Sequence, residues 1–251
     1  MKGLGSIVFS AAMVISMSAS ASEIRVFSGG APQEVFAALV PKFERQSGHK
    51  VTFVYEVITA LRERIARGET ADVLVMPVPV LDGYAKEGRL RDDARATFGT
   101  VAVGVAVKEG AAKPNISTQE KFRAAMLAAR SVVHATPGKT PSGSHLGKVM
   151  QQLGIADAMA KKTTYRPALE GGVQLLAEGK ADIGIYPASE VAGVKGLTVV
   201  GPLPAGIDLI IVYGAAATTG GNETAVAFVQ FMAAPENRAA WQHGGFVPPE
   251  N

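Results

Sequence analysis

Hydrogen-bond donors suited to an anion come together in the stretch Ser28, Gly29 and Gly30. This stretch follows the short apolar run of residues 24–27 and precedes a helical pattern that begins near Pro32. A strand that leads through a Gly-rich turn into a helix aims free backbone N–H groups and the positive end of the helix dipole at one point. We therefore predict that these three residues hold an anion. The alternative is an ordinary turn in which the glycines only permit tight geometry.

A second stretch of the chain repeats this plan. Residues 131–134 have a strand pattern, residues 136–144 are rich in turn formers, and a helical pattern follows over 146–153. The donors in this stretch are Thr140, Ser142, Gly143 and Ser144. Because both stretches have the order strand, Gly/Ser loop and helix, we predict that they face each other and hold the ligand from opposite sides.

Five further residues extend the predicted binding site: Thr59, Arg64, Gly172, Val173 and Tyr186. Thr59 lies at the head of a predicted helix and offers a hydroxyl, or acts only as the helix cap. A guanidinium such as that of Arg64 suits a carboxylate, unless it points into solvent. Gly172 and Val173 offer N–H groups at another helix start. Tyr186 ends a predicted strand, where it would close the pocket.

One side chain of the second stretch could move a proton. His145 follows the donor loop directly, and imidazole titrates near neutral pH, so His145 is the candidate general base. The alternative is a surface or packing histidine on a helix. The histidines share no metal-ligand spacing, the chain has no cysteine, and no zinc-protease, serine-hydrolase or P-loop motif occurs. The sequence therefore predicts no metal site and no cofactor.

The elements that must position these residues alternate between strands and helices. Nearly continuous apolar runs predict buried strands at 71–76, 101–107 and 181–186, and amphipathic patterns predict helices such as 32–46 and 222–233. The first and last of these strands both begin with Ala-Asp after a Gly-capped helix. This order is typical of an α/β fold with parallel strands.

The repeated plan predicts two α/β domains. One comprises residues 22–104 plus 206–251, and the other comprises residues 105–205. Two chain crossings between them would form a hinge. Because an open α/β sheet binds ligands beyond the carboxyl ends of its strands, the ligand is expected in the interdomain cleft.

The beginning of the 251-residue chain has the pattern of a secretory leader. Lys2 precedes a mostly apolar stretch over residues 4–17, and the small residues Ala-Ser-Ala follow at 19–21. This pattern predicts a signal peptide over residues 1–21 and a periplasmic mature protein. The formal charge of +3 suits small anions, and without a Lys/Arg run it predicts no nucleic-acid partner.

Four segments, 26–30, 61–75, 179–185 and 231–237, resemble the molybdate-binding periplasmic proteins of ABC importers. The resemblance covers the whole mature chain in order, implies the two-domain type II periplasmic binding fold, and places a ligand-contacting tyrosine near Tyr186. A branch of that superfamily that includes periplasmic aconitate isomerase is more similar in the Ser-Gly-Gly of the first loop, at 28–30, and in residues 64–73, 105–117 and 142–143.

The resemblance departs from the molybdate binders at two loops. Ala31 stands where the family usually presents a serine, and Val57, Ile58 and Thr59 stand where it usually presents a run of serines. A tetrahedral oxyanion in a dry pocket needs several N–H and O–H donors. The missing hydroxyls therefore favour a small organic carboxylate over molybdate or tungstate.

Two functions fit the sequence. The favoured one is the periplasmic substrate-binding protein of an ABC importer, a monomer that delivers a small anion to a membrane permease. The alternative is an enzyme similar to aconitate isomerase, which shifts an allylic proton between trans- and cis-aconitate. Only a positioned base separates the two.

Overall fold

The computed structural model describes residues 21–249 of the chain. The strands are β1 (Glu23–Ser28), β2 (Lys50–Tyr55), β3 (Val73–Pro77), β4 (Leu90–Lys108), β5 (Val132–His134), β6 (Thr163–Tyr165), β7 (Ile183–Pro187), β8 (Leu197–Pro202) and β9 (Ile210–Thr218). The α-helices are α1 (Gln33–Ser47), α2 (Ile58–Ala66), α3 (Val78–Lys86), α4 (Gln119–Ala128), α5 (Pro141–Gln152), α6 (Ala156–Ala160), α7 (Gly172–Ala177), α8 (Glu223–Ala233) and α9 (Arg238–His243). Short 3-10 helices occur at η1 (Ala168–Glu170), η2 (Ala188–Glu190) and η3 (Pro235–Asn237).

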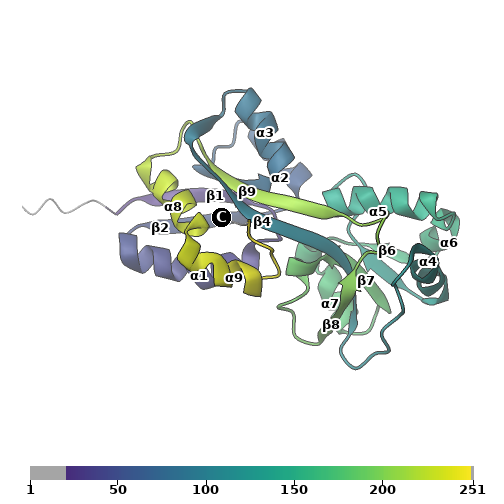
Figure 1. Cartoon of the computed structure of the whole chain (residues 1–251). Helices are drawn as coiled ribbons and strands as arrows, with labels where there is room; N and C mark the ends of the chain where they lie inside the picture. The colour runs from purple at the N-terminus through teal and green to yellow at the C-terminus, as the bar shows by residue number, and fades with distance from the viewer. Residues whose placement is uncertain (1–20, 250–251) are drawn as a thin grey trace, which may run out of the picture.

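Two α/β lobes lie side by side, and the strands β4 and β9 run between them (Figure 1). The first lobe contains β1–β3, β9 and the start of β4, with α1–α3, α8 and α9 around them. The second lobe contains the end of β4 and β5–β8, with α4–α7. This arrangement confirms the predicted α/β fold with two units that meet at a cleft.

The strand β4 connects the lobes because it changes partner along its length. From Leu90 to Ala102 it pairs with β9, and from Val103 to Lys108 it pairs with β7 and β8. All three partners are antiparallel to it, whereas β1 pairs in parallel with β2 and β3, and β5 pairs in parallel with β6 and β7. The parallel strands predicted from the sequence are therefore confined to the outer part of each lobe. The predicted domain boundaries remain predictions.

Two elements differ from the sequence prediction. The strand predicted at 101–107 already begins at Leu90. Its first part was not predicted, because charged residues interrupt the apolar pattern before residue 100 and the pairing with β9 shifts in register there. The helix predicted from residue 146 begins at Pro141, because Thr140 caps it and a proline suits the first helical position. Residues 142–145 therefore belong to the first turns of a helix and not to a loop.

An aromatic cluster forms the core of the first lobe. Trp241 stacks on Phe98 with ring centroids 4.3 Å apart, and meets Phe36 edge-on at 5.8 Å. The Trp241 indole N–H donates a hydrogen bond to the carbonyl oxygen of Met232 at 2.8 Å, so its polar atom is satisfied inside the core. In a chain without cysteine, this packing holds α1, α8 and α9 on the sheet.

The two Ala-Asp pairs that the sequence repeats occupy equivalent places. The Asp72 carboxylate, just before β3, accepts the Arg25 backbone N–H at 2.7 Å. The Asp182 carboxylate, just before β7, accepts the Arg130 backbone N–H at 2.8 Å. Each aspartate thus fixes the chain at the outer end of its lobe, far from the carboxyl ends of the parallel strands.

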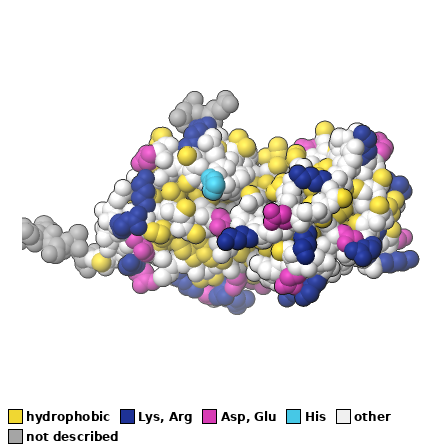
Figure 2. Space-filling model, turned by 90° about the horizontal axis from the view of Figure 1, so that it is seen from below, with side chains coloured by type: hydrophobic (Ala, Val, Ile, Leu, Met, Phe, Trp, Pro, Cys, Tyr) yellow, Lys and Arg dark blue, Asp and Glu magenta, His cyan; other side chains and the backbone are white. Residues whose placement is uncertain are grey.

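Charged side chains of both signs are spread over the surface. On the face drawn in Figure 2, Lys and Arg side chains are interspersed with Asp and Glu side chains. Exposed ion pairs such as Arg91–Glu223 and Arg95–Asp82 add little to stability. Within residues 21–249 no helix is long and apolar enough to cross a membrane. The predicted signal peptide falls on residues 1–21, and residues 1–20 lie outside the described part of the chain.

Candidate functional site

A narrow cavity lies between the lobes, at the carboxyl ends of β1 and β7. Its volume is about 30 Å³, which is space for about one water molecule. A ligand larger than that enters only when the lobes separate. The first lobe contributes Gly29, Gly30, Glu56, Val57, Ile58 and Tyr213 to the lining, and the second contributes Thr140, Ser142, Leu169 and Glu190.

The first lobe forms one wall of the cavity, called here the first wall, and close packing requires glycine at two of its positions. A Cβ on Gly29 would lie 2.9 Å from Cδ1 of Ile58 and 3.4 Å from the Tyr213 hydroxyl. A Cβ on Gly30 would lie 2.7 Å from Cγ of Leu169, which belongs to the opposite lobe. The main chain at Gly29 and Gly30 therefore lines the cavity directly. The Gly29 N–H is already bonded to the carbonyl of Val75 at 3.1 Å.

The helix α2 also presents its N-terminus to the cavity. Val57 precedes the helix and has no side-chain acceptor, so no side-chain cap satisfies its first turn. Val57 and Ile58 both line the cavity. Compared with the molybdate binders, this loop lacks serine hydroxyls. Uncapped backbone N–H groups stand in their place.

The second wall is the N-terminus of α5. The Thr140 hydroxyl accepts the Gly143 N–H at 3.0 Å and lies 3.2 Å from the Ser142 hydroxyl. Ser142 is 4% exposed, and its own N–H lies in the first helical turn, where no intrahelical acceptor exists. Thr140 and Ser142 therefore bring hydroxyls, and Ser142 a backbone donor, to the side of the cavity opposite Gly29 and Gly30.

Other predicted donors are engaged within the protein. The buried Ser28 hydroxyl donates to the carbonyl of Gly29 at 2.8 Å. The Ser144 hydroxyl donates to the carbonyl of Thr140 at 2.9 Å and accepts the Gly138 N–H. Gly143 packs against the carbonyl oxygens that follow β5, which leaves no room for a Cβ. Ser28, Gly143 and Ser144 shape the two loops and do not line the cavity.

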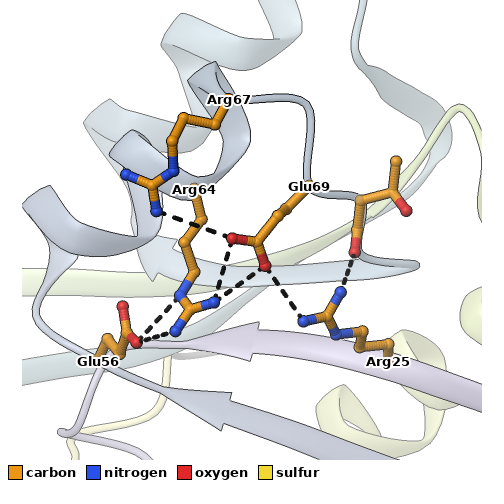
Figure 3. Close-up of polar contacts among 6 residues, drawn as sticks. Arg25, Glu56, Arg64, Arg67 and Glu69 are labelled. Carbon is orange, nitrogen blue, oxygen red and sulfur yellow. Dashed lines mark hydrogen bonds and ion pairs between the residues drawn. The ribbon is translucent and has the colours of Figure 1, made fainter.

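Arg64 is bound by two carboxylates (Figure 3). Its Nε and Nη2 atoms donate to Glu56, and its Nη1 atom donates to both oxygens of Glu69. These hydrogen bonds raise the pKa of Arg64 and lower the pKa of Glu56 and of Glu69. Arg25 and Arg67 also reach Glu69. Arg64 therefore neutralises Glu56 beside the cavity without lining the cavity itself.

Three predicted residues lie behind the second wall. The fully buried Tyr186 donates its hydroxyl to the carbonyl of Arg166 at 2.7 Å. Gly172 packs directly against that hydroxyl, so the glycine makes room for the tyrosine. Val173 borders a wider groove of about 360 Å³ that adjoins the cavity past Gly30 and Leu169.

The candidate base His145 lies outside the cavity. Its Nε2–H donates to the carbonyl oxygen of Ile207 at 2.8 Å, in the segment that leads into β9. His145 is absent from the lining of both the cavity and the adjoining groove. Its catalytic role stays a prediction that this placement does not favour. Among residues 21–249 no group of His, Asp and Glu side chains is placed to hold a metal ion.

Sequence reasoning missed Glu190, as it did Glu56, Leu169 and Tyr213 in the same lining. Glu190 ends η2, three residues beyond the end of β7, and borders both the cavity and the adjoining groove. Burial raises the pKa of Glu190 to about 7. No hydrogen bond or ion pair to its carboxylate occurs within the described residues. Its place just after a buried strand, at the carboxyl end of the sheet, is the signal that could have found it.

A model of the bacterial extracellular solute-binding proteins matches residues 24–247. The chain belongs to this family. The aconitate isomerase of a Pseudomonas species is 27% identical to it over 233 residues, which cover 90% of this chain and 87% of that protein.

Solved structures of periplasmic binding proteins have the same fold. The molybdate-binding protein of Azotobacter vinelandii superposes with a TM-score of 0.75 at 20% identity, over 90% of this chain and 100% of that one. The sulfate-binding protein SubI of Mycobacterium tuberculosis superposes with a TM-score of 0.69 at 21% identity, over 91% and 88% of the two chains. The predicted type II periplasmic binding fold is therefore confirmed.

Two contacts between the lobes of this solute-binding protein close the cleft. The Thr59 hydroxyl, on α2, donates to the carbonyl oxygen of Lys139 in the opposite lobe at 3.1 Å. Leu169 packs onto Gly30 from the opposite side. Thr59, predicted as a ligand donor, thus lies at the edge of the cleft. Both contacts must break for the cleft to open.

Proposed function

We propose that this solute-binding protein binds a small organic anion in the cleft between its lobes. The observation that carries the proposal is the meeting of neutral donors from both lobes. The uncapped start of α2 and the main chain at Gly30 face the hydroxyls of Thr140 and Ser142. Such donors, together with helix dipoles, stabilise negative charge in a water-excluded site without a cation.

The proposed physiological role is that of the periplasmic receptor of an ABC importer. Closure around the anion would bring the lobes together at their edges, where Thr59 contacts Lys139 in this structure, and the closed lobes would present one surface to the permease. In this proposed role, the protein works as a monomer, needs no cofactor and reaches the periplasm through the predicted leader.

A thermal-shift screen tests this proposal. The mature protein is heated with molybdate, sulfate, fumarate, succinate, citrate and trans-aconitate in separate samples. A ligand that binds only the folded state at one hundred times its Kd adds about 2.7 kcal/mol to the free energy of unfolding. We expect stabilisation by at least one carboxylate. Stabilisation by molybdate or sulfate alone would contradict the organic-anion proposal.

A second candidate function is the isomerisation of aconitate. It is favoured by the relative named aconitate isomerase and by the carboxyl of Glu190 beside the cavity, whose pKa of about 7 suits a general base. In this reaction, the base removes a proton from the methylene carbon. The double bond then moves, and a proton is returned to the former vinyl carbon.

The conversion of trans-aconitate to cis-aconitate tests this candidate. If the wild-type protein converts trans-aconitate, Glu190→Gln should abolish the reaction and His145→Ala should retain it. Loss of turnover in His145→Ala with retention in Glu190→Gln would return the role of base to His145. Binding of trans-aconitate without conversion would exclude the enzyme.

A further inference from the structure

Glu190 occupies a central place in the cleft. Glu190 lines the cavity together with Gly30, Ser142 and Ile58, and it also lines the adjoining groove. It acts electrostatically on both Tyr186, in β7, and Tyr213, in β9. An anion held by the donors of the two walls would therefore meet Glu190.

The groups around Glu190 do not compensate a negative charge. Tyr186 and Tyr213 are buried, and burial together with Glu190 raises the pKa of each. Glu34, on α1, and Tyr55, on β2, border the same groove, and Glu56 borders the cavity.

No lysine or arginine lines the cavity or the groove within residues 21–249. Arg64 forms ion pairs with Glu56 and Glu69, and the positive charge of Arg166 lowers the pKa of Tyr186. An ionised Glu190 would thus stand beside the ligand's negative charge with no lysine or arginine lining the site within residues 21–249. A neighbouring negative charge disfavours the ionised form of a carboxyl, so the bound anion would favour the protonated form of Glu190.

We propose that the cleft takes up its anion together with one proton, which Glu190 carries. In the acid form, Glu190 becomes an O–H donor and completes the neutral donor set of Gly30, Ile58 and Ser142. This inference rests on the proposed binding of an anion and adds how that binding depends on pH.

The sign of the pH dependence follows from the two protonation states. Burial alone raises the pKa of Glu190 to about 7, and a bound anion raises it further. Below pH 7 the acid form is present before the anion arrives, so affinity is highest there. Above pH 7 each binding event must also take a proton from water. The Kd is therefore expected to rise about tenfold between pH 6 and pH 8.

Calorimetric titration of the full-length mature protein tests the inference. The probes are fumarate, sulfate and whichever other carboxylate stabilises the protein in the thermal-shift screen, each at pH 6, 7 and 8. Titration in buffers of different ionisation enthalpy measures the protons taken up. For wild type at pH 8 we expect close to one proton per anion, and a Kd about ten times that at pH 6.

Glu190→Gln is the decisive variant because its amide cannot ionise but still donates a hydrogen bond. Its Kd should be the same at pH 6 and pH 8, with no proton uptake. Glu63→Gln removes an exposed carboxylate on the outer side of α2 and should keep the wild-type pH dependence. If the Kd changes with pH only because the probe itself ionises, the same pH dependence of the Kd would persist in Glu190→Gln. That result would contradict the inference.

The outcomes separate the inference from the proposed function. If no anion binds at any pH, both fall. If anions bind to wild type with a Kd that does not change with pH and without proton uptake, only the inference falls. An affinity that increases with pH would show that Glu190 acts as a carboxylate, and this also overturns the inference. The wild-type proton uptake decides the question even if Glu190→Gln does not fold.

Discussion

The two lobes are alike at their outer ends and different where they face each other. At the outer ends, Asp72 and Asp182 make the same hydrogen bond to the main chain at the start of a neighbouring strand. At the cleft, the first lobe offers backbone donors and apolar groups around Gly30, with Glu56 and Tyr213 beside them, whereas the second offers the Ser142 hydroxyl and Glu190. The shared end builds the fold, and the unlike ends give the cleft its chemistry.

This difference also bears on the proposed anion, for which the two walls would supply donors without a cation. The first wall supplies donors that are fixed in the main chain and cannot ionise. The second wall supplies side chains, and only Glu190 among the cleft-lining side chains of the described residues can change charge near neutral pH. One lobe thus provides constant polarity, and the other provides a charge that depends on pH.

The largest expected effect tests the first wall. Gly30→Ala places a methyl group 2.7 Å from Cγ of Leu169, so the lobes cannot close fully. Overpacking of this kind costs about 2 kcal/mol, which is about a thirtyfold increase in the Kd of the anion measured by calorimetry.

Gly83→Ala is the matched control for Gly30→Ala. Gly83 lies inside α3 with nothing within 4 Å of an added Cβ, so alanine there should leave the Kd unchanged and increase stability by up to about 1 kcal/mol. In the Gly30→Ala background, Leu169→Ala should restore part of the affinity. Wild-type affinity in Gly30→Ala would show that the Leu169 contact does not belong to the bound state.

The second test asks whether the outer ends are equivalent. Asp72→Ala and Asp182→Ala each leave a backbone N–H without its carboxylate partner, and each should lower the free energy of unfolding by about 1.5 kcal/mol. Urea denaturation measures the change. Neither substitution should alter the anion Kd, and the exposed Asp92→Ala should change stability by less than about 0.5 kcal/mol. A change of Kd in only one aspartate variant would break the equivalence.

The contribution of Asp182 to stability should depend on pH. The Arg130 guanidinium, aided by backbone N–H groups, holds the pKa of Asp182 below its usual range. Because the folded-state pKa is lowered, the stabilisation is present above the unfolded pKa of about 3.9 and is lost as the pH falls toward the folded pKa. The stability difference between wild type and Asp182→Asn should therefore shrink below about pH 4. An undiminished difference at pH 3 would contradict this assignment.

A smaller effect is expected at the second wall. Ser142→Ala removes one hydroxyl from the cavity and should raise the anion Kd by about threefold to tenfold, as expected for one hydrogen bond. Ser117→Ala removes a hydroxyl that interacts only with Asn115 and Lys121 among the described residues and should leave the Kd unchanged. If Ser142→Ala binds as wild type does, the backbone donors of the two walls are sufficient.

The smallest effect is expected at the edge of the cleft. Thr59→Val removes the hydrogen bond from α2 to Lys139 and should raise the anion Kd by about twofold to fivefold, because this bond exists only when the lobes are closed. Thr52→Val removes a similar bond to Ile24 within the first lobe and should leave the Kd unchanged. Equal effects of both variants on the Kd would contradict a closure role for Thr59.

Much of the fold could be predicted because its signals are local. Apolar runs of five or six residues give β3 and β7, and the repeated Ala-Asp pairs mark equivalent positions. The strand β4 was only half predicted, because its first part is charged and pairs with β9 through shifts in register. β6 has three residues, too few to form a pattern.

The predicted site divides in the same way. Gly29, Gly30, Thr140 and Ser142 line the cavity, because in each lobe they lie where a strand ends and a helix starts. Arg64 and Tyr186 do not reach it, because their polar atoms find partners in Glu56 and in the carbonyl of Arg166. Sequence spacing does not show which partner a long side chain meets.

The sequence by itself determined the α/β alternation, the two donor loops and their place at helix starts, since each depends on neighbours along the chain. Only the tertiary structure decided that Leu169 covers Gly30, that His145 bonds to Ile207, and that Glu190 lies in the cleft. The physical reason is desolvation: the protonation of Glu190 depends on how far the residues around the cleft, which come from distant parts of the chain, shield it from water.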